Sequence, residues 1–140
     1  MGIKAIEDAV YDRLNGFIKD LAVEAYPDNP DLYELKHAKG SVMVHFEGAT
    51  AGQPERRGTM VQREDLNFGI TVMVRSLKRN TSGAYDVIDL IKQALAGHKI
   101  SGCGKIYLRG TALVQIVDGV WEYSVGITVP TVMIINQEQT

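Results

Sequence analysis

The side chains of this 140-residue chain that could act as metal ligands or nucleophiles are three histidines and one cysteine. His37 and His45 are eight residues apart, and His98 and Cys103 are five apart. Neither pair has the tight spacing of a zinc site, which needs four ligands or three ligands and a water. Nothing near Cys103 supports a cysteine–histidine nucleophile. We therefore expect no metal ligand and no catalytic residue here, and we interpret Cys103 as a buried or half-buried thiol.

The segment Gly102-Cys103-Gly104-Lys105 invites comparison with phosphate-binding loops. A P-loop needs Gly at position 99 and Ser or Thr at 106, and a dinucleotide fingerprint needs Gly at 107. Lys, Ile and Tyr stand at those positions. The segment also follows a predicted helix and precedes a predicted strand, which is the reverse of a phosphate site at a helix N-terminus. It is interpreted as a connector, and we expect no cofactor.

Neighbouring carboxylates are a third possible source of chemistry, because paired acids can serve as general acid and base. Each pair fits a solvated helix face or a strand end more simply, so the sequence predicts no enzyme. The pairs are Glu64 with Asp65, Asp86 with Asp89, and Asp8 with Asp12.

The composition is that of an ordinary globular chain, with 45% hydrophobic and 23% charged residues. This excludes a disordered tail, a collagen-like rod and a disulfide scaffold, since a single cysteine forms no intrachain bridge. Val and Ile together number 26 against 10 Leu, which favours strands because branching at Cβ suits a pleated sheet. The length favours one domain over residues 1–140.

The ends of the chain show no targeting or membrane segment. Lys4, Glu7 and Asp8 interrupt the N-terminus before an apolar run forms. The longest apolar stretch, residues 127–135, is broken by Pro130 and is about half of the ~18 residues that a membrane span needs. We expect a protein of the cytoplasm, or one assembled there, with no membrane partner.

Apolar spacing of three and four predicts a first helix over residues 3–25, with a kink or break at Asn15-Gly16 and a stop at Pro27 and Pro30. Alternation predicts a strand at residues 41–46. Residues 47–59 contain Gly, Pro and nothing apolar larger than Ala, so they predict a long exposed loop carrying Arg56 and Arg57.

The remainder alternates between strand and helix patterns. A strand at 66–75 precedes a polar turn and a helix from Ala84 to Leu95 that Gly97 ends. Short strands at 105–108 and 112–117 follow, and Asp118-Gly119 predicts a hairpin into a strand at 121–129. The predicted fold is α+β, with an antiparallel four- to five-stranded sheet, two main helices packed on one face, and the order α-β-β-α-β-β-β.

The net charge of −2 is unevenly distributed along the chain. Residues 1–35 carry three basic and eight acidic side chains, or −5, whereas residues 36–80 carry eight and four, or +4. Two readings stay open: complementary patches that meet between copies, or solvated faces. The basic residues lack interleaved aromatics, so sequence-specific nucleic-acid binding is not expected. The candidate contacts to another subunit or a protein partner are Arg56, Arg57, Arg63, Lys78 and Arg79.

Four segments stand in an order that is similar to a known family. They are Phe68-Gly-Ile-Thr-Val-Met-Val-Arg75, Gly83-Ala-Tyr-Asp-Val-Ile-Asp-Leu90, Ala94-Leu-Ala-Gly97 and Gly119-Val-Trp-Glu-Tyr-Ser-Val-Gly-Ile127. Together with the N-terminal helix, they resemble a small family of Mu-like prophage proteins with a tail-terminator-like fold, distantly similar to the lambda tail terminator. The resemblance covers nearly the whole chain.

The resemblance implies a structural protein of the virion tail, assembled in the host cytoplasm. It implies a hexameric ring that caps the tail tube and contacts the head connector, with no active site. The partners would be further copies of the chain, the tube protein and the connector protein. A ring needs heterologous contacts, to which the two charged regions and the open edges of a sheet could contribute. The alternative is a small cytoplasmic α+β enzyme or ligand-binding domain.

The exposed 47–59 segment generates a first prediction. Reversing the charge of both Arg56 and Arg57 to Glu should impair tail completion and leave the isolated fold intact, because the segment would meet its partner only in the particle. Electron microscopy of particles measures tail completion, and thermal unfolding of the purified variant measures the fold. Unchanged assembly would contradict the prediction.

Overall fold

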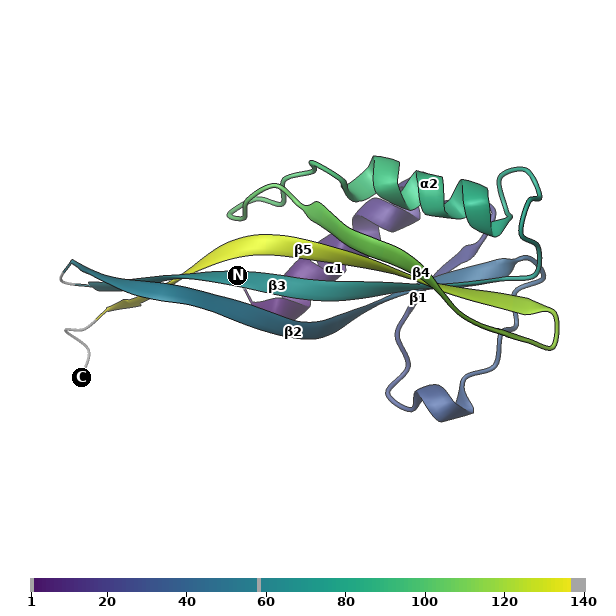
Figure 1. The fold of residues 1–140 in the computed structure, drawn as a ribbon, viewed down its shortest axis with the longest axis horizontal. Helices are drawn as coiled ribbons and strands as arrows, with labels where there is room; N and C mark the ends of the chain where they lie inside the picture. Colours follow the sequence, from purple (N-terminus) through teal and green to yellow (C-terminus); the bar gives the residue numbers. More distant parts are fainter. Residues whose placement is uncertain (1, 58, 137–140) are drawn as a thin grey trace.

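The computed structural model describes residues 2–57 and 59–136, without the side chains of 32, 56, 57, 59, 135 and 136. Within these residues a five-stranded sheet has the order β1-β2-β3-β5-β4, and two helices cover one face of it (Figure 1). The elements are α1 (Ile3–Phe17), β1 (Ala22–Ala25), the 3₁₀ turn η1 (Pro30–Leu32), β2 (Gly40–Arg57), β3 (Thr59–Val74), α2 (Ala84–Leu95), β4 (Tyr107–Val117) and β5 (Val120–Asn136).

The predicted α+β class and the two helices on one face are confirmed, but the sheet is mixed. The pair β1–β2 is parallel, whereas β2–β3, β3–β5 and β4–β5 are antiparallel. Residues 26–39, here called the strap, connect the two parallel strands. In Figure 1 the strap loops below the sheet, whereas α2 lies above it and α1 runs behind the strands.

The first helix is shorter than its apolar spacing predicts. It ends at Phe17, directly after Asn15-Gly16, and the amide of Ile18 closes the last turn on the carbonyl of Leu14 at 2.8 Å. Residues 18–25 were wrongly assigned to the helix because Ile18, Leu21 and Ala25 fit its spacing. The same residues also alternate, and the parallel partner β2 selects the strand that forms β1.

The largest error concerns residues 47–59, because residues 47–57 and Thr59 belong to two paired strands rather than to a loop. Strand β2 continues to Arg57, and β3 begins at Thr59. The pairing of β2 with β3 continues past two bulges, one between Phe46 and Gly48 and one between Ala51 and Pro54. These bulges accommodate within the strand the Gly and Pro residues that favour a loop. Proline is tolerated because this part of β2 is an edge that needs no outward amide. The extension, with the C-terminal half of β5, is here called the arm: residues 48–57, 59–67 and 128–136.

The last third matches the prediction more closely. Asp118 and Gly119 both have positive φ, 51° and 76°, as a two-residue hairpin requires. The two short strands predicted at 105–108 and 112–117 are one strand, β4, because a bulge between Leu108 and Gly110 carries the pairing past the glycine.

The core lies between the two helices and the part of the sheet that they cover (Figure 1). Phe68 of β3 is fully buried at its centre and packs edge-to-face on Phe46, with ring centroids 5.6 Å apart. The predicted apolar positions of α2 are all buried against it, as are three positions of α1. They are Ala84, Val87, Ile88, Ile91, Leu95, Ile6, Val10 and Leu14.

None of the helices within residues 2–57 and 59–136 is both long and apolar enough to cross a membrane.

The position of Phe68 generates a second prediction. Phe68→Ala should lower the free energy of unfolding by about 3–5 kcal/mol, because a large ring at the core centre leaves a cavity. The matched control is Phe17→Ala, at the end of α1, where the residue is 37% exposed and Arg13 stacks on its ring. That change should cost no more than about 1 kcal/mol. Urea unfolding of both variants measures the difference, and equal costs would contradict the assigned core.

Candidate assembly surfaces

The sheet face away from the helices carries one ion pair that reaches across four strands. Arg109 of β4 donates from Nη2 to Oε1 of Glu47 in β2 at 2.7 Å, and to the carbonyl of Phe68 in β3 at 3.0 Å. Its Nε donates to the carbonyl of Ile127 in β5 at 3.3 Å. Arginine suits this task because its planar fork presents several donors in fixed directions. The pair ties both halves of the sheet together.

Two glycines leave room on the sheet face for the side chains of Arg109 and Glu47. A Cβ at Gly126 would lie 3.0 Å from the Arg109 guanidinium, and one at Gly69 would lie 2.9 Å from the Glu47 carboxyl carbon. Both charged residues sit at bulges, Arg109 between Leu108 and Gly110 and Glu47 between Phe46 and Gly48. A bulge re-aims a side chain, and here each bulge turns a charge onto the sheet face. The sequence analysis missed Arg109, and the spacing of Gly69 and Gly126 was its only signal.

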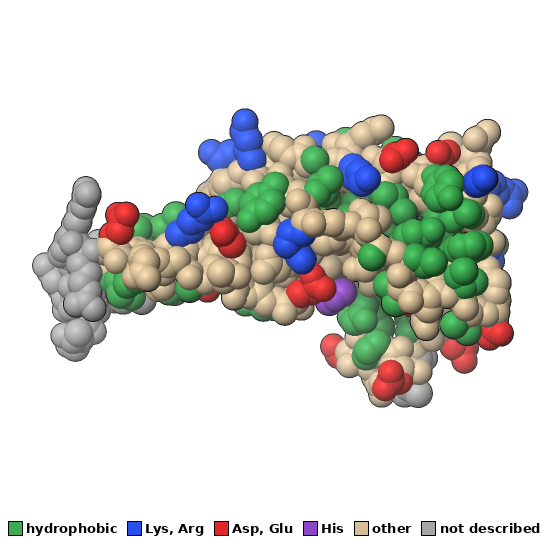
Figure 2. Space-filling view, viewed as in Figure 1, with side chains coloured by type: hydrophobic (Ala, Val, Ile, Leu, Met, Phe, Trp, Pro, Cys, Tyr) green, Lys and Arg blue, Asp and Glu red, His purple; other side chains and the backbone are tan. Residues whose placement is uncertain are grey.

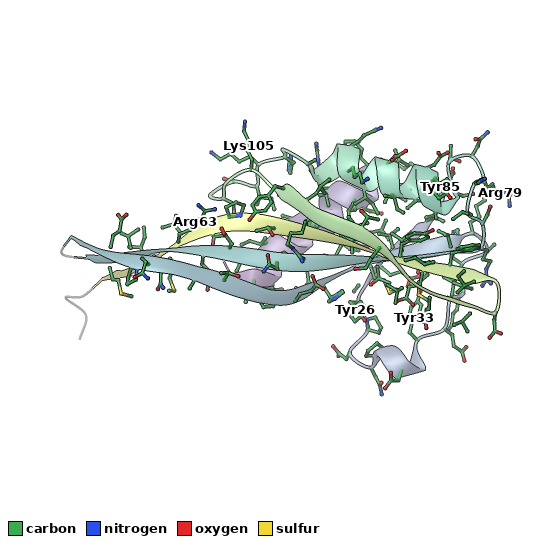
Figure 3. All side chains as sticks on the ribbon, viewed as in Figure 1. Tyr26, Tyr33, Arg63, Arg79, Tyr85 and Lys105 are labelled. Carbon is green, nitrogen blue, oxygen red and sulfur yellow. The ribbon has the colours of Figure 1, made fainter. Side chains whose placement is uncertain are left out.

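The strap forms a shallow groove with the same sheet face. Tyr26 and Tyr33 line it from the strap, while Met43 and Met73 lie on the sheet side of a hollow of about 260 Å³ (Figure 3). The Tyr33 hydroxyl donates to Glu24 at 2.9 Å and shares a 2.8 Å hydrogen bond with Ser41. Burial is the largest cause that raises the pKa of Tyr33, so the hydroxyl stays protonated and fixes the strap.

The histidines and the cysteine lie apart. His45 stacks on Tyr26, with ring centroids 4.3 Å apart, and its Nε2 lies 3.9 Å from the Glu47 carboxylate. The Nδ1 atom of His37 accepts hydrogen bonds from the backbone amides of Lys39 and Gly40, within the strap and at its junction with β2. Cys103 is buried, as predicted, and burial raises the pKa of its thiol. Among the described residues, no three acidic, histidine or cysteine side chains are placed to share a metal ion.

The predicted basic contacts do not form one patch. Arg63 lies on the arm, where it is paired with Asp65 at 3.1 Å, whereas Lys78 and Arg79 lie in the exposed loop after the other end of β3 (Figure 3). The side chains of Arg56 and Arg57 lie outside the described residues. Their proposed contacts remain predictions.

Large apolar side chains are exposed instead, in two places. Edge strand β4 exposes Leu113, Val114, Ile116 and Val117, each to about half of its full area (47–53%). Figure 2 shows hydrophobic side chains gathered at this end of the molecule, beside α2 and the β4–β5 hairpin. On the arm, Val132 and Ile134 of β5 are 59% and 67% exposed.

Strand β5 is apolar on both faces of the arm, as its register shows. Ile134, opposite Val61, lies on one face, and Met133, opposite Gln62, lies on the other. This part of β5 extends beyond the helices (Figure 1). Val132 and Ile134 are largely exposed, whereas Leu66, Thr128 and Val129 at the base of the arm are buried. Exposed apolar residues on both faces of a sheet are typical of a surface that another protein covers.

Comparison with known protein families gives a match over most of the chain. The family model described as "Gp37 protein" matches residues 10–140. The chain belongs to the Gp37 protein family. Comparison with curated protein sequences finds no relative.

A solved structure shares the fold of this Gp37-family chain. It is a chain of the "virion of native gene transfer agent (GTA) particle", with a TM-score of 0.57 and 13% sequence identity. The match covers 91% of the Gp37-family chain and 95% of the other chain.

The path of Arg109 generates a third prediction. Gly126→Ala should lower the free energy of unfolding by about 1–2 kcal/mol, because the new methyl displaces the guanidinium from its acceptors. In an Arg109→Ala background the same change should be almost free, since nothing remains to be displaced. The matched control is Gly110→Ala on the same strand pair, where a Cβ meets nothing within 4 Å.

Urea unfolding of the four chains of this double-mutant cycle measures the coupling. An equal cost of Gly126→Ala in both backgrounds would contradict the role assigned to the glycine.

Proposed function

We propose that this Gp37-family chain is a tail terminator of a phage or phage-like particle. It is a non-enzymatic structural protein of the virion, and it forms a hexameric ring that caps the tail tube and contacts the head connector. The observation that carries the proposal is the shared fold with a chain of a gene transfer agent virion, over nearly the full length of both chains.

The exposed surfaces support the same function. A ring of identical subunits needs two different patches on each copy, and the chain has a bare apolar edge at β4 and, on the arm, a strand β5 with exposed apolar side chains on both faces. A capping ring must also contact proteins above and below itself. An extended arm beyond the helical core provides a surface for such a contact at little cost to the core.

The strap groove favours one alternative, a ligand-binding domain. A small molecule would sit between Tyr26, Tyr33 and Met73 in a hollow of about 260 Å³. Drug-sized ligands usually occupy clefts of about 300–1,000 Å³ that bury most of their surface. This hollow is smaller than that range. Two further hollows beside the strap, of about 420 and 350 Å³, are large enough but more open to solvent, so they would bury less of a ligand. The assembly role is therefore the better supported.

The proposal generates a fourth prediction, on particles from the producing host. Deleting the gene should leave heads and tails unjoined, because the tube end lacks its cap, and expression of the wild-type chain should restore complete particles. Immunogold labelling of an epitope-tagged chain should mark the head-proximal end of the tail. Complete particles without the chain, or label spread along the tube, would contradict the proposal.

A further inference from the structure

The sheet has two bare edges, one on each side. On the β4 side no strand follows β4 in the described part of the chain. On the other side, β1 pairs only with positions Ser41 to Val44 of β2, so the outer edge of β2 within the arm is unpaired among residues 2–57 and 59–136. Unpaired edges present amides and carbonyls that another strand can use.

Natural sheets protect such edges with charges, yet a stretch of each of these bare edges carries none. Residues 110–117 of β4 and residues 48–54 of β2 contain no Asp, Glu, Lys or Arg. On β4 the exposed positions are instead large and apolar. A long edge that lacks charge and exposes apolar side chains is one that pairs with another chain.

The two edges also match in length between their bulges. In β2 the bulges at Phe46/Gly48 and Ala51/Pro54 enclose residues 48–51, and in β4 the bulges at Leu108/Gly110 and Leu113/Gln115 enclose residues 110–113. Each segment is a regular four-residue stretch that begins with glycine. Regular pairing between two chains needs stretches that are free of bulges, and each edge provides one such stretch.

Strand direction decides how two copies can join. Since β2–β3, β3–β5 and β5–β4 are all antiparallel, β4 runs opposite to β2 within one copy. A second copy in the same orientation therefore presents its β2 antiparallel to the first copy's β4. No inversion of the second copy is needed, which is the condition for a heterologous, ring-forming contact.

Side-chain size is complementary across the same contact. Residues 48–52 of β2 are Gly, Ala, Thr, Ala and Gly, and those described there as exposed include Ala49 and Ala51. Leu113 is the one large side chain among residues 110–113 and is 47% exposed, and it lies opposite Gly48 when residue 110 meets residue 51.

We propose that the edge of β4 in one copy pairs antiparallel with the arm edge of β2 in the next, residues 110–113 against residues 48–51. One contact then satisfies both bare edges, and every copy carries one of each. The inference rests on the proposed function in taking a second copy as the partner. The four bulges increase the local twist, which curves the shared sheet.

The test uses two double variants and a control. Thr111→Lys with Leu113→Lys places charges on the β4 edge at two exposed side chains within residues 110–113, and Ala49→Lys with Ala51→Lys does so on the β2 edge. The control is Ile3→Lys on α1, an equally apolar and 45% exposed residue away from both edges. Analytical ultracentrifugation and native mass spectrometry give the oligomeric state, and thermal unfolding confirms each fold.

Wild type and Ile3→Lys should assemble, whereas each edge variant alone should need at least about tenfold more protein to do so. An equimolar mixture of the two edge variants should form heterodimers and nothing larger, because only one intact β4–β2 pair remains. A β2-edge variant that still dimerises alone would overturn the proposal in favour of β4–β4 pairing.

Hydrogen exchange of the wild-type chain provides a second measurement that needs no variant. Amides in residues 48–51 and 110–113 should exchange more slowly in concentrated than in dilute protein. A wild-type chain that stays monomeric at about millimolar concentration, where even weak pairs form, would overturn the inference. That result would leave the proposed function standing if labelling still placed the chain at the tail end, so the two failures are distinguishable.

Discussion

The full-length pairing of β3 is the constraint on which the rest of the structure depends. All sixteen of its residues, from Thr59 to Val74, have a partner on β5, and its other edge pairs with β2 along nearly the same length. The helices cover only the half of β3 that includes Phe68 and Ile70. A strand that is longer than its core must extend beyond it, and the arm is that extension. Once β3 is fixed, the arm and both bare edges follow from where its neighbours end.

The sequence predicts the parts of the fold that are buried. The stripe of α2, the alternation around Phe68 and the Asp118-Gly119 turn each reflect a local constraint: burial of one face, or positive φ at two successive residues. The arm gives no such signal in β2, because neither face of residues 48–55 is buried by the chain itself. Its Gly and Pro residues have loop propensity, and pairing with β3 overrides it. The parallel strand β1 was hidden for a related reason, since four residues are too few to distinguish a strand from the last turn of a helix.

The ion pair of Arg109 with Glu47 was beyond sequence reasoning, because its two partners are 62 residues apart and meet only through strand order. What could be read were the two glycines in otherwise regular strands. A glycine inside a strand often marks a close approach by another group, and Gly69 and Gly126 are paired across β3 and β5. In the register of the sheet, these two glycines lie side by side and leave space on its face. The long polar side chains of Arg109 and Glu47 occupy that space.

The regional charges of the chain also take a different meaning in three dimensions. The acidic residues 1–35 and the basic residues 36–80 suggested two opposed patches. Some of these charged side chains, however, form hydrogen bonds within one copy, at the same end of the sheet. Arg75 donates to the strap carbonyls of Leu35 and His37, and the Thr81 hydroxyl, in the loop that follows Arg79, donates to the carboxylate of Asp20. Charges used in this way hold the strap and the β3–α2 loop in place. The uncharged stretches of the two edges and the exposed apolar side chains of the arm offer main-chain and apolar contacts for association. Contacts of this kind are insensitive to salt and strict about strand direction, which are properties that suit a closed ring built from identical copies.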